Sequence, residues 1–281
     1  MPTTHPAAPD QSVASPRLPE PIRILLAPVI LLAAIFAPYV LTLTPPVQQA
    51  VAGMPEVGQL AIALVLFAGT TLVAVGLLAL VARYVDRVRL RDYGWRWDAR
   101  SLPALLLGIG VSLACVVPAL AVLAAMGLLG APEDRGDAAL WIVVTMALGQ
   151  AFLLQGIPEE LIFRGYLLTT LRDRGPVAAV WISAVLFGAL HLVSQGGQQG
   201  VLGHLAYLAW PFGFGLAAGA LCLATRSVWA AVGIHGGSHV ATLITDLLGW
   251  GSGPVAWVTI GVIYTLVGVL VLRRYQARRP A

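Results

Sequence analysis

Long apolar runs separated by short polar stretches dominate the pattern along this 281-residue chain. A helix needs about 20 consecutive apolar residues to cross a bilayer, and these runs are of that order. They predict an all-α fold, a polytopic membrane helix bundle of about eight transmembrane helices within residues 21–281. The expected spans run near residues 22–44, 57–83, 102–130, 137–172, 176–193, 200–224, 227–248 and 254–272.

Composition supports the membrane as the solvent of this chain. Hydrophobic residues make up 58% of the sequence and charged residues 11%, with a mean hydropathy of +0.84, whereas soluble domains carry roughly 25% charge. Residues 1–20 are the exception, because they are rich in Pro, Ala, Ser and Thr without a hydrophobic period, and we expect a disordered cytoplasmic tail there. Both cysteines, Cys115 and Cys222, fall inside apolar runs, which argues against a disulfide framework.

The basic residues indicate how the bundle is oriented. The chain contains no lysine, and all 17 basic residues are arginines. All but Arg135 and Arg164 fall in the two terminal segments or in alternate loops, on one side of the predicted bundle. Cytoplasmic loops carry such an excess, so we expect both termini in the cytoplasm. These arginines border apolar spans and form no aromatic-interleaved patch, which argues against a nucleic-acid partner.

Ionisable side chains cluster in the spans of the second half of the chain, although each costs about 2.5–3.5 kcal/mol at the centre of a membrane helix. Counted from the predicted cytoplasmic ends at about 1.5 Å per residue, they fall within one slab of the bilayer. Helices that run in opposite directions thus bring polar groups to one depth, which predicts a polar cavity inside the bundle. The residues are Glu159, Glu160 and Arg164 in 137–172, His191 in 176–193, and His235 and His239 in 227–248.

Helical geometry predicts how these groups are used. Glu160 and Arg164 are four residues apart and can pair on one face, whereas Glu159 points about 100° away and stays free for chemistry. Two histidines and a carboxylate can hold Zn²⁺ with a position left for water, and a nearby glutamate can act as general base. His235 and His239 have the spacing of a zinc-protease helix, but Gly236 replaces that motif's glutamate.

The order Glu159-Glu160-x-x-x-Arg164, Phe187-x-x-x-His191 and His235-x-x-x-His239 resembles the three-motif signature of the CPBP family. That family comprises type II CAAX prenyl endopeptidases and Abi-type bacteriocin-processing and self-immunity proteins. The resemblance covers about residues 140–248 and places a CAAX-protease-like core at about 137–250.

The resemblance implies an intramembrane endopeptidase that hydrolyses a peptide bond in a membrane-associated or lipidated protein or peptide. Glu159 matches the glutamate that activates water and His191 its histidine partner, while Glu160 and Arg164 orient the first motif. His235 matches the third-motif histidine, whereas His239 stands where the family commonly has Asn. We expect a divalent metal, zinc, with Glu159, His191 and His235 as ligands, and a bacterial plasma membrane as the location.

Other readings of the same residues stay open. The Glu-Glu-Arg set alone can be a structural ion pair that clamps helices. Buried carboxylate–histidine chains also serve as proton relays in transporters, although no inverted repeat is evident here. A non-catalytic immunity or scaffold protein of the same family is the third possibility. Sequence leaves the oligomeric state and the substrate undetermined.

Overall fold

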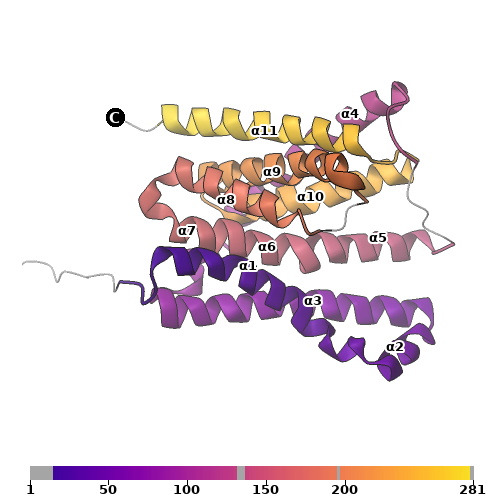
Figure 1. Ribbon diagram of the computed structural model, residues 1–281, viewed down its shortest axis with the longest axis horizontal. Helices are drawn as coiled ribbons and strands as arrows, with labels where there is room; N and C mark the ends of the chain where they lie inside the picture. Colours follow the sequence, from indigo (N-terminus) through magenta and orange to yellow (C-terminus); the bar gives the residue numbers. More distant parts are fainter. Residues whose placement is uncertain (1–14, 132–136, 195–196, 279–281) are drawn as a thin grey trace, which may run out of the picture.

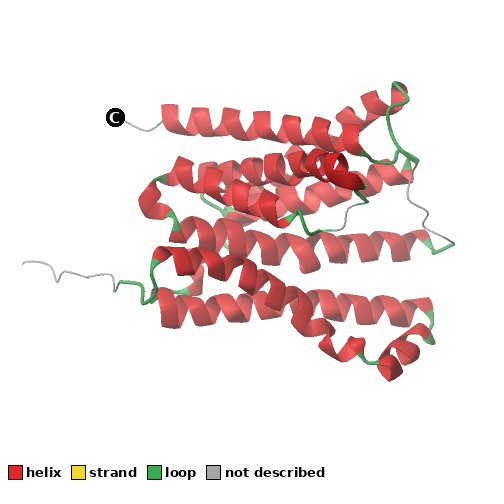
Figure 2. Ribbon diagram, in the orientation of Figure 1, coloured by secondary structure: helices red, strands yellow, loops and turns green. Residues whose placement is uncertain are grey.

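The computed structural model describes residues 15–131, 137–194 and 197–278, and within these ranges it consists of helices and connecting loops without strands (Figures 1 and 2). The predicted all-α bundle is therefore confirmed. Most of the predicted tail, residues 1–20, lies outside the described residues. The α-helices are α1 Glu20–Phe36, α2 Pro45–Ala52, α3 Glu56–Val81, α4 Ser101–Ala125, α5 Leu140–Gly149, α6 Ile157–Glu160, α7 Leu168–Thr170, α8 Pro176–Leu190, α9 Gly200–Thr225, α10 Val228–Leu247 and α11 Pro254–Ala277.

Each of the eight predicted spans coincides with a helical segment, and six of these segments are long and apolar enough to cross a membrane. The six are Glu20–Val40, Glu56–Asp86, Ser101–Ala125, Leu140–Thr170, Gly200–Thr225 and Pro254–Ala277. The other two are α8, which has only 15 residues, and α10, whose apolar character is interrupted by two histidines and three glycines. The short helix α2 falls between two predicted spans and was not expected.

Apolar side chains face outward along the bundle, as they do in a protein solvated by lipid. Leu25 in α1 is 65% exposed, Leu72 in α3 70%, and Leu266 in α11 57%. An exposed apolar surface of this extent is unfavourable in water and is ordinary against hydrocarbon. The chain is therefore an integral membrane protein.

The helices form layers, with α11 along α9 at one side, α10 with α4 behind, and α3 with α1 at the opposite side (Figure 1). The long segment from α5 to α7 lies between these groups. The first residue of α1 and the last of α11 lie at the same end of the bundle, as an even number of crossings requires. This central segment carries Glu159 and Glu160, so the site is built from the middle layer.

Glycines allow the close approach of α4 to α10 and of α9 to α11. A Cβ on Gly108 of α4 would overlap the Ala230 carbonyl oxygen of α10, and one on Gly233 would overlap the Leu105 carbonyl oxygen. Likewise, a Cβ on Gly213 of α9 would overlap the backbone of α11. Small residues let membrane helices pack through their backbones, and this packing fixes α10, the helix that carries His235.

We predict that Gly108→Ala destabilises the bundle because its new methyl group meets immovable backbone atoms. The expected loss is about 1–3 kcal/mol, the usual cost of overpacking, and appears as a lower Tm of the purified protein in detergent. Gly110→Ala is the matched control, since a Cβ there meets nothing within 4 Å. Equal Tm values for the two variants would contradict the proposed backbone contact.

Candidate functional site

The Glu159-Glu160 pair sits in a short α-helical turn between two wider, π-helical segments. Residues Gln150–Gly156 and Leu161–Leu167 have the π-helical hydrogen-bond pattern and flank α6. Pro158 has no N–H to offer to an earlier carbonyl, and the hydroxyl of Thr71 in α3 donates to the carbonyl of Leu153. Such departures from α-helical geometry are frequent at functional sites.

Glu160 is the centre of a buried polar network. Its side chain has no exposed surface, and the Nη1 of Arg164 donates to its Oε1 at 3.0 Å. The Nδ1 of His235, from α10, lies 2.8 Å from the same oxygen. The i, i+4 pair expected from sequence is therefore present, and it extends to a histidine 75 positions along the chain.

Arg164 is held on several sides. Its Nη2 donates to the carbonyl of Gly215 at 3.1 Å, and its guanidinium lies 4.5 Å from the ring centroid of Phe187. The rings of Phe163 and Phe214 lie 5.8 Å away, so three aromatic faces surround the cation. A Cβ on Gly215 would lie 2.9 Å from Nη2, so glycine makes room for the arginine.

His235 is oriented by its bond to Glu160. Since a carboxylate accepts hydrogen bonds, the Nδ1 of His235 carries the proton in this contact, and Nε2 is left for other chemistry. The ring packs edge-on against Phe214, with 4.9 Å between centroids, and stacks on His239 at 5.4 Å and 15°. The shared face of His235 and His239 expected from sequence is thus present.

Glu159 is buried as well but is not paired. Glu159 is only 9% exposed. Within the described ranges its carboxylate makes no hydrogen bond or ion pair. Glu160, Arg164 and His235 lie within electrostatic range of it. A buried carboxylate that makes no hydrogen bond of its own is available for general-base chemistry.

His191 lies at the end of α8, nearer the surface than the other groups. Its Nδ1 donates to the carbonyl of Phe187 at 2.8 Å, which leaves Nε2 as the acceptor nitrogen of the neutral ring. The ring is 4.7 Å from that of Phe187 and 6.4 Å from that of Tyr207, and His235 and Arg164 are within electrostatic range. In the part of the chain that the structure describes, no hydrogen bond or ring contact joins His191 to Glu159.

Among the described residues, no group of three or more His, Cys, Asp or Glu side chains lies close enough to hold a metal ion. Glu159, His191 and His235, the expected ligands, are therefore not assembled as a ligand set, and Nδ1 of His235 is committed to Glu160. We derive no step through a metal from this geometry.

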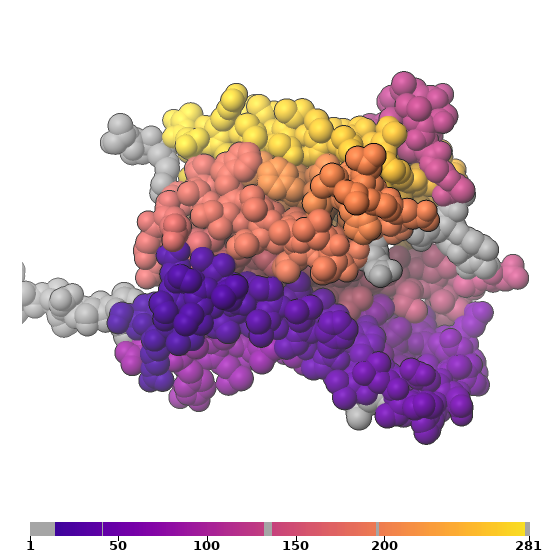
Figure 3. Space-filling view, in the orientation of Figure 1, coloured from indigo at the N-terminus to yellow at the C-terminus, as the bar shows by residue number. Residues whose placement is uncertain are grey.

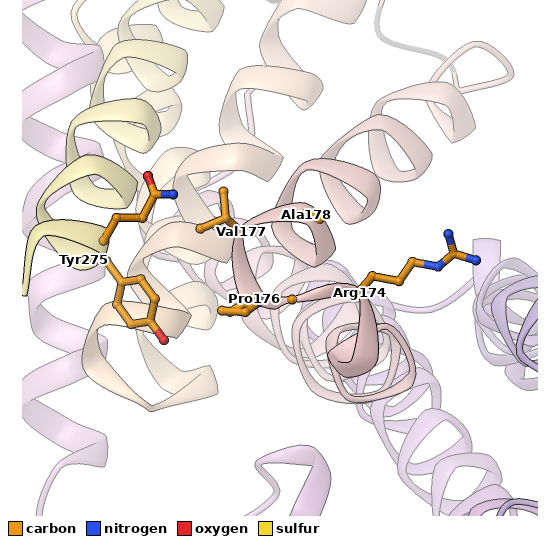
Figure 4. Close-up of a pocket in the computed structure, with 7 residues that line it drawn as sticks. Arg174, Pro176, Val177, Ala178 and Tyr275 are labelled. Carbon is orange, nitrogen blue, oxygen red and sulfur yellow. The ribbon is translucent and has the colours of Figure 1, made fainter. Parts of the chain in front are cut away.

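Two hollows open near the end of the bundle where α8 and α10 begin. One, of about 420 Å³, lies between the loop at Tyr93, the backbone region of Arg164 and Gly165, and Cys222 of α9. The other, of about 340 Å³, lies between Pro176 and Tyr275, and Arg174 extends away from it (Figure 4). Only the first reaches the polar network, at Arg164.

The sequence analysis missed three neighbours of the site, namely Gly215, Phe214 and Tyr207. The signal available in the sequence was Phe214 next to Gly215, an aromatic residue beside a glycine in a span that faces the motifs. His204, which belongs to none of the three motifs, is half-buried, and its Nδ1 donates to the carbonyl of Gly200 in its own helix.

We predict that Arg164→Met strongly destabilises the protein, because it leaves the Glu160 carboxylate buried without its cation. Removing one partner of a buried ion pair costs about 3–5 kcal/mol, whereas replacing both partners costs much less. Thermal unfolding should therefore show a smaller loss for Glu160→Gln combined with Arg164→Met. Arg96→Met, which breaks an exposed pair with Asp98, is the control and should cost less than about 1 kcal/mol.

Comparison with known proteins matches this region to a protein family. The family model described as Rce1-like, type II CAAX prenyl endopeptidase, matches residues 137–241. The match begins just before α5, ends within α10 and contains every candidate residue of the site. No curated protein matches the chain.

Proposed function

Because residues 137–241 match the family model of Rce1-like type II CAAX prenyl endopeptidases, we propose that the chain is a CAAX-type membrane endopeptidase whose general base is Glu159. One observation supports this assignment above the others. Among the described residues, the buried carboxylate and guanidinium side chains are those of Arg23, Asp86, Glu159, Glu160 and Arg164. Four of them form two ion pairs, which leaves Glu159 as the unpaired acid.

In the proposed reaction, Glu159 removes a proton from water as the water attacks a peptide carbonyl, and later returns a proton to the leaving amine. His191 assists by accepting a hydrogen bond from that water at Nε2. An oxyanion forms at the attacked carbonyl, and preorganised donors stabilise such charge. We assign that role to His235, whose ring is oriented by the Glu160 carboxylate at its Nδ1 and stacks on His239.

Glu160 and Arg164 are assigned orienting roles rather than direct chemistry. Glu160 is enclosed and bonded to both Arg164 and His235, so it is not available to a substrate. Its contact fixes the ring orientation of His235, in the way that a carboxylate partner fixes a catalytic histidine. Gly215 and three phenylalanine rings hold Arg164, which in turn holds Glu160.

The proposed substrate is a membrane-associated peptide or protein, lipidated or not. The apolar exterior of the bundle supports a substrate that arrives through the bilayer, and the family name refers to prenylated proteins. We further propose a bacterial plasma membrane as the location, with both termini in the cytoplasm, because nearly all arginines lie on the side of the termini.

The topology proposal predicts that a reporter protein fused after Ala281 is active in the cytoplasm. A matched fusion in the loop between α4 and α5, on the opposite side, should report an external location. Fluorescence and alkaline phosphatase fusions measure the two cases. An external carboxyl terminus would mean an odd number of crossings and would overturn the arginine-based orientation.

We predict that Glu159→Gln and His191→Ala each abolish peptide cleavage while leaving Tm within a few degrees of wild type. The combined variant should be no worse than either alone, because the two residues act as one unit. His239→Asn should be much milder, since Asn can still donate to an oxyanion. Cleavage of a fluorogenic peptide, with and without a farnesyl group on its cysteine, provides the measurement.

If Glu159→Gln cleaves as well as wild type, the base is misassigned and a non-catalytic scaffold or immunity role becomes the better explanation. The cleavage rates of the peptides with and without the farnesyl group show whether the enzyme recognises that lipid. A protein that cleaves both equally has no requirement for the prenyl group.

Metal dependence is a separate proposal. A bound divalent metal, zinc in our expectation, would lower the pKa of its water and polarise the carbonyl, and Glu159, His191 and His235 are its expected ligands. We predict about one metal ion per chain in the protein purified without chelators, and much less in His191→Ala. Elemental analysis measures both, with His204→Ala as control. Metal-free protein that cleaves normally would exclude the metal.

A further inference from the structure

A second buried ion pair lies beside the segment that carries the candidate site, where Arg23 also donates to the hydroxyl of Thr170 at 3.5 Å. Arg23, at the start of α1, contacts Asp86, at the end of the second span, through both carboxylate oxygens at 2.7 and 2.9 Å. Arg23 is 9% exposed and Asp86 3% exposed. Both residues lie outside the region that matches the family model, residues 137–241.

Tyrosine hydroxyls connect this pair to the segment that carries the site. Tyr93 donates to the second carboxylate oxygen of Asp86 at 2.6 Å, and Tyr166 donates to the backbone carbonyl of Arg23 at 2.6 Å. The two rings pack edge to face at 5.3 Å. Burial and the bond to Asp86 raise the pKa of the Tyr93 hydroxyl, so it remains a donor at any working pH.

The loop that holds Tyr93 packs so closely against Leu161–Leu167 that a shift of the loop would displace this segment. Tyr166 is two residues beyond Arg164, and a Cβ on the intervening Gly165 would overlap the carbonyl oxygen of Tyr93. The loop that holds Tyr93 therefore lies directly on the backbone beside Arg164. Helix α1 also contacts this segment, and in Figure 3 its indigo surface borders the salmon surface of later parts of the chain.

Attachment alone does not require a buried charge pair. Buried ion pairs are often replaceable by apolar residues without loss of stability, whereas they can specify one geometry. The exposed pair of Glu20 with Arg174, at 2.6 Å, already links α1 to the turn after α7. The two-point geometry of Arg23 and Asp86 adds a fixed orientation, which a single exposed contact does not provide.

We propose that Arg23, Asp86, Tyr93 and Tyr166 form a positioning network that sets the register of Leu161–Leu167 and so aligns Arg164 and Glu160 with His235. The inference rests on the proposed function for its catalytic consequence, but the positional effect exists without it. None of the four side chains contacts the candidate site residues through its polar atoms. They act through the backbone of the segment.

The test uses Cys222 as a reporter that does not depend on activity. Its thiol lies 3.8 Å from the carbonyl of Arg164, and this half-buried residue lines the 420 Å³ hollow together with Tyr93. In a Cys115→Ala background, a small water-soluble maleimide reports the packing around Arg164. Peptide cleavage is measured in parallel on the same full-length variants in detergent.

We expect Tyr93→Phe and Asp86→Asn to raise the rate of Cys222 alkylation about tenfold and to lower kcat about 10–100-fold, the scale of a 1 Å misplacement. KM should stay constant, because the network does not touch substrate. Glu20→Gln, which breaks only the exposed pair, is the control and should change neither quantity. Tyr93→Phe removes one hydroxyl and keeps the test valid if Asp86→Asn does not fold.

Unchanged alkylation and unchanged kcat in Tyr93→Phe would overturn the positioning network. A lower kcat together with a lower Tm, at an unchanged rate of Cys222 alkylation, would also overturn it, because that pattern indicates general destabilisation. A wild-type protein without any cleavage would refute the proposed function instead, and the alkylation rates would still decide the network.

Discussion

The buried carboxylate of Glu160, shared between Arg164 and His235, is the interaction on which the rest of the site depends. Burying a carboxylate in a low-dielectric interior is costly unless a cation and further donors compensate it. Arg164 supplies the cation from one turn away and His235 supplies a donor from another helix. To meet that histidine, α6 has to lie against α10. The arginine in turn needs the glycine and the aromatic rings that enclose it.

Much of the fold could be predicted from the sequence because the bilayer imposes simple lengths. Spans such as 57–83 and 102–130 match α3 and α4 closely, since apolar run length alone defines them. The widened π-helical turns around α6 could not be predicted, because they depend on tertiary contacts such as Thr71 with Leu153. Helix α2 was missed for a similar reason, as its eight residues show no apolar run.

For the candidate site, local geometry was predictable and long-range contact was not. The pairing of Glu160 with Arg164 follows from a spacing of four residues on a helix. The bond from Glu160 to His235 depends on how closely α6 approaches α10. Gly236 permits that approach, because a Cβ there would overlap the ring of Phe152 in the Gln150–Gly156 segment. Similarly, nothing in the pattern around Gly215 indicates that its carbonyl serves an arginine.

Charge balance links the two buried clusters to the chemistry. Arg23 with Asp86, and Arg164 with Glu160, are each neutral as pairs, so neither leaves a net charge inside the bundle. Glu159 is the one buried acid in the described residues without such a partner. A carboxylate without a partner in a low-dielectric interior is stabilised by taking up a proton. In the proposed reaction water supplies that proton, so the imbalance at Glu159 favours the step assigned to it.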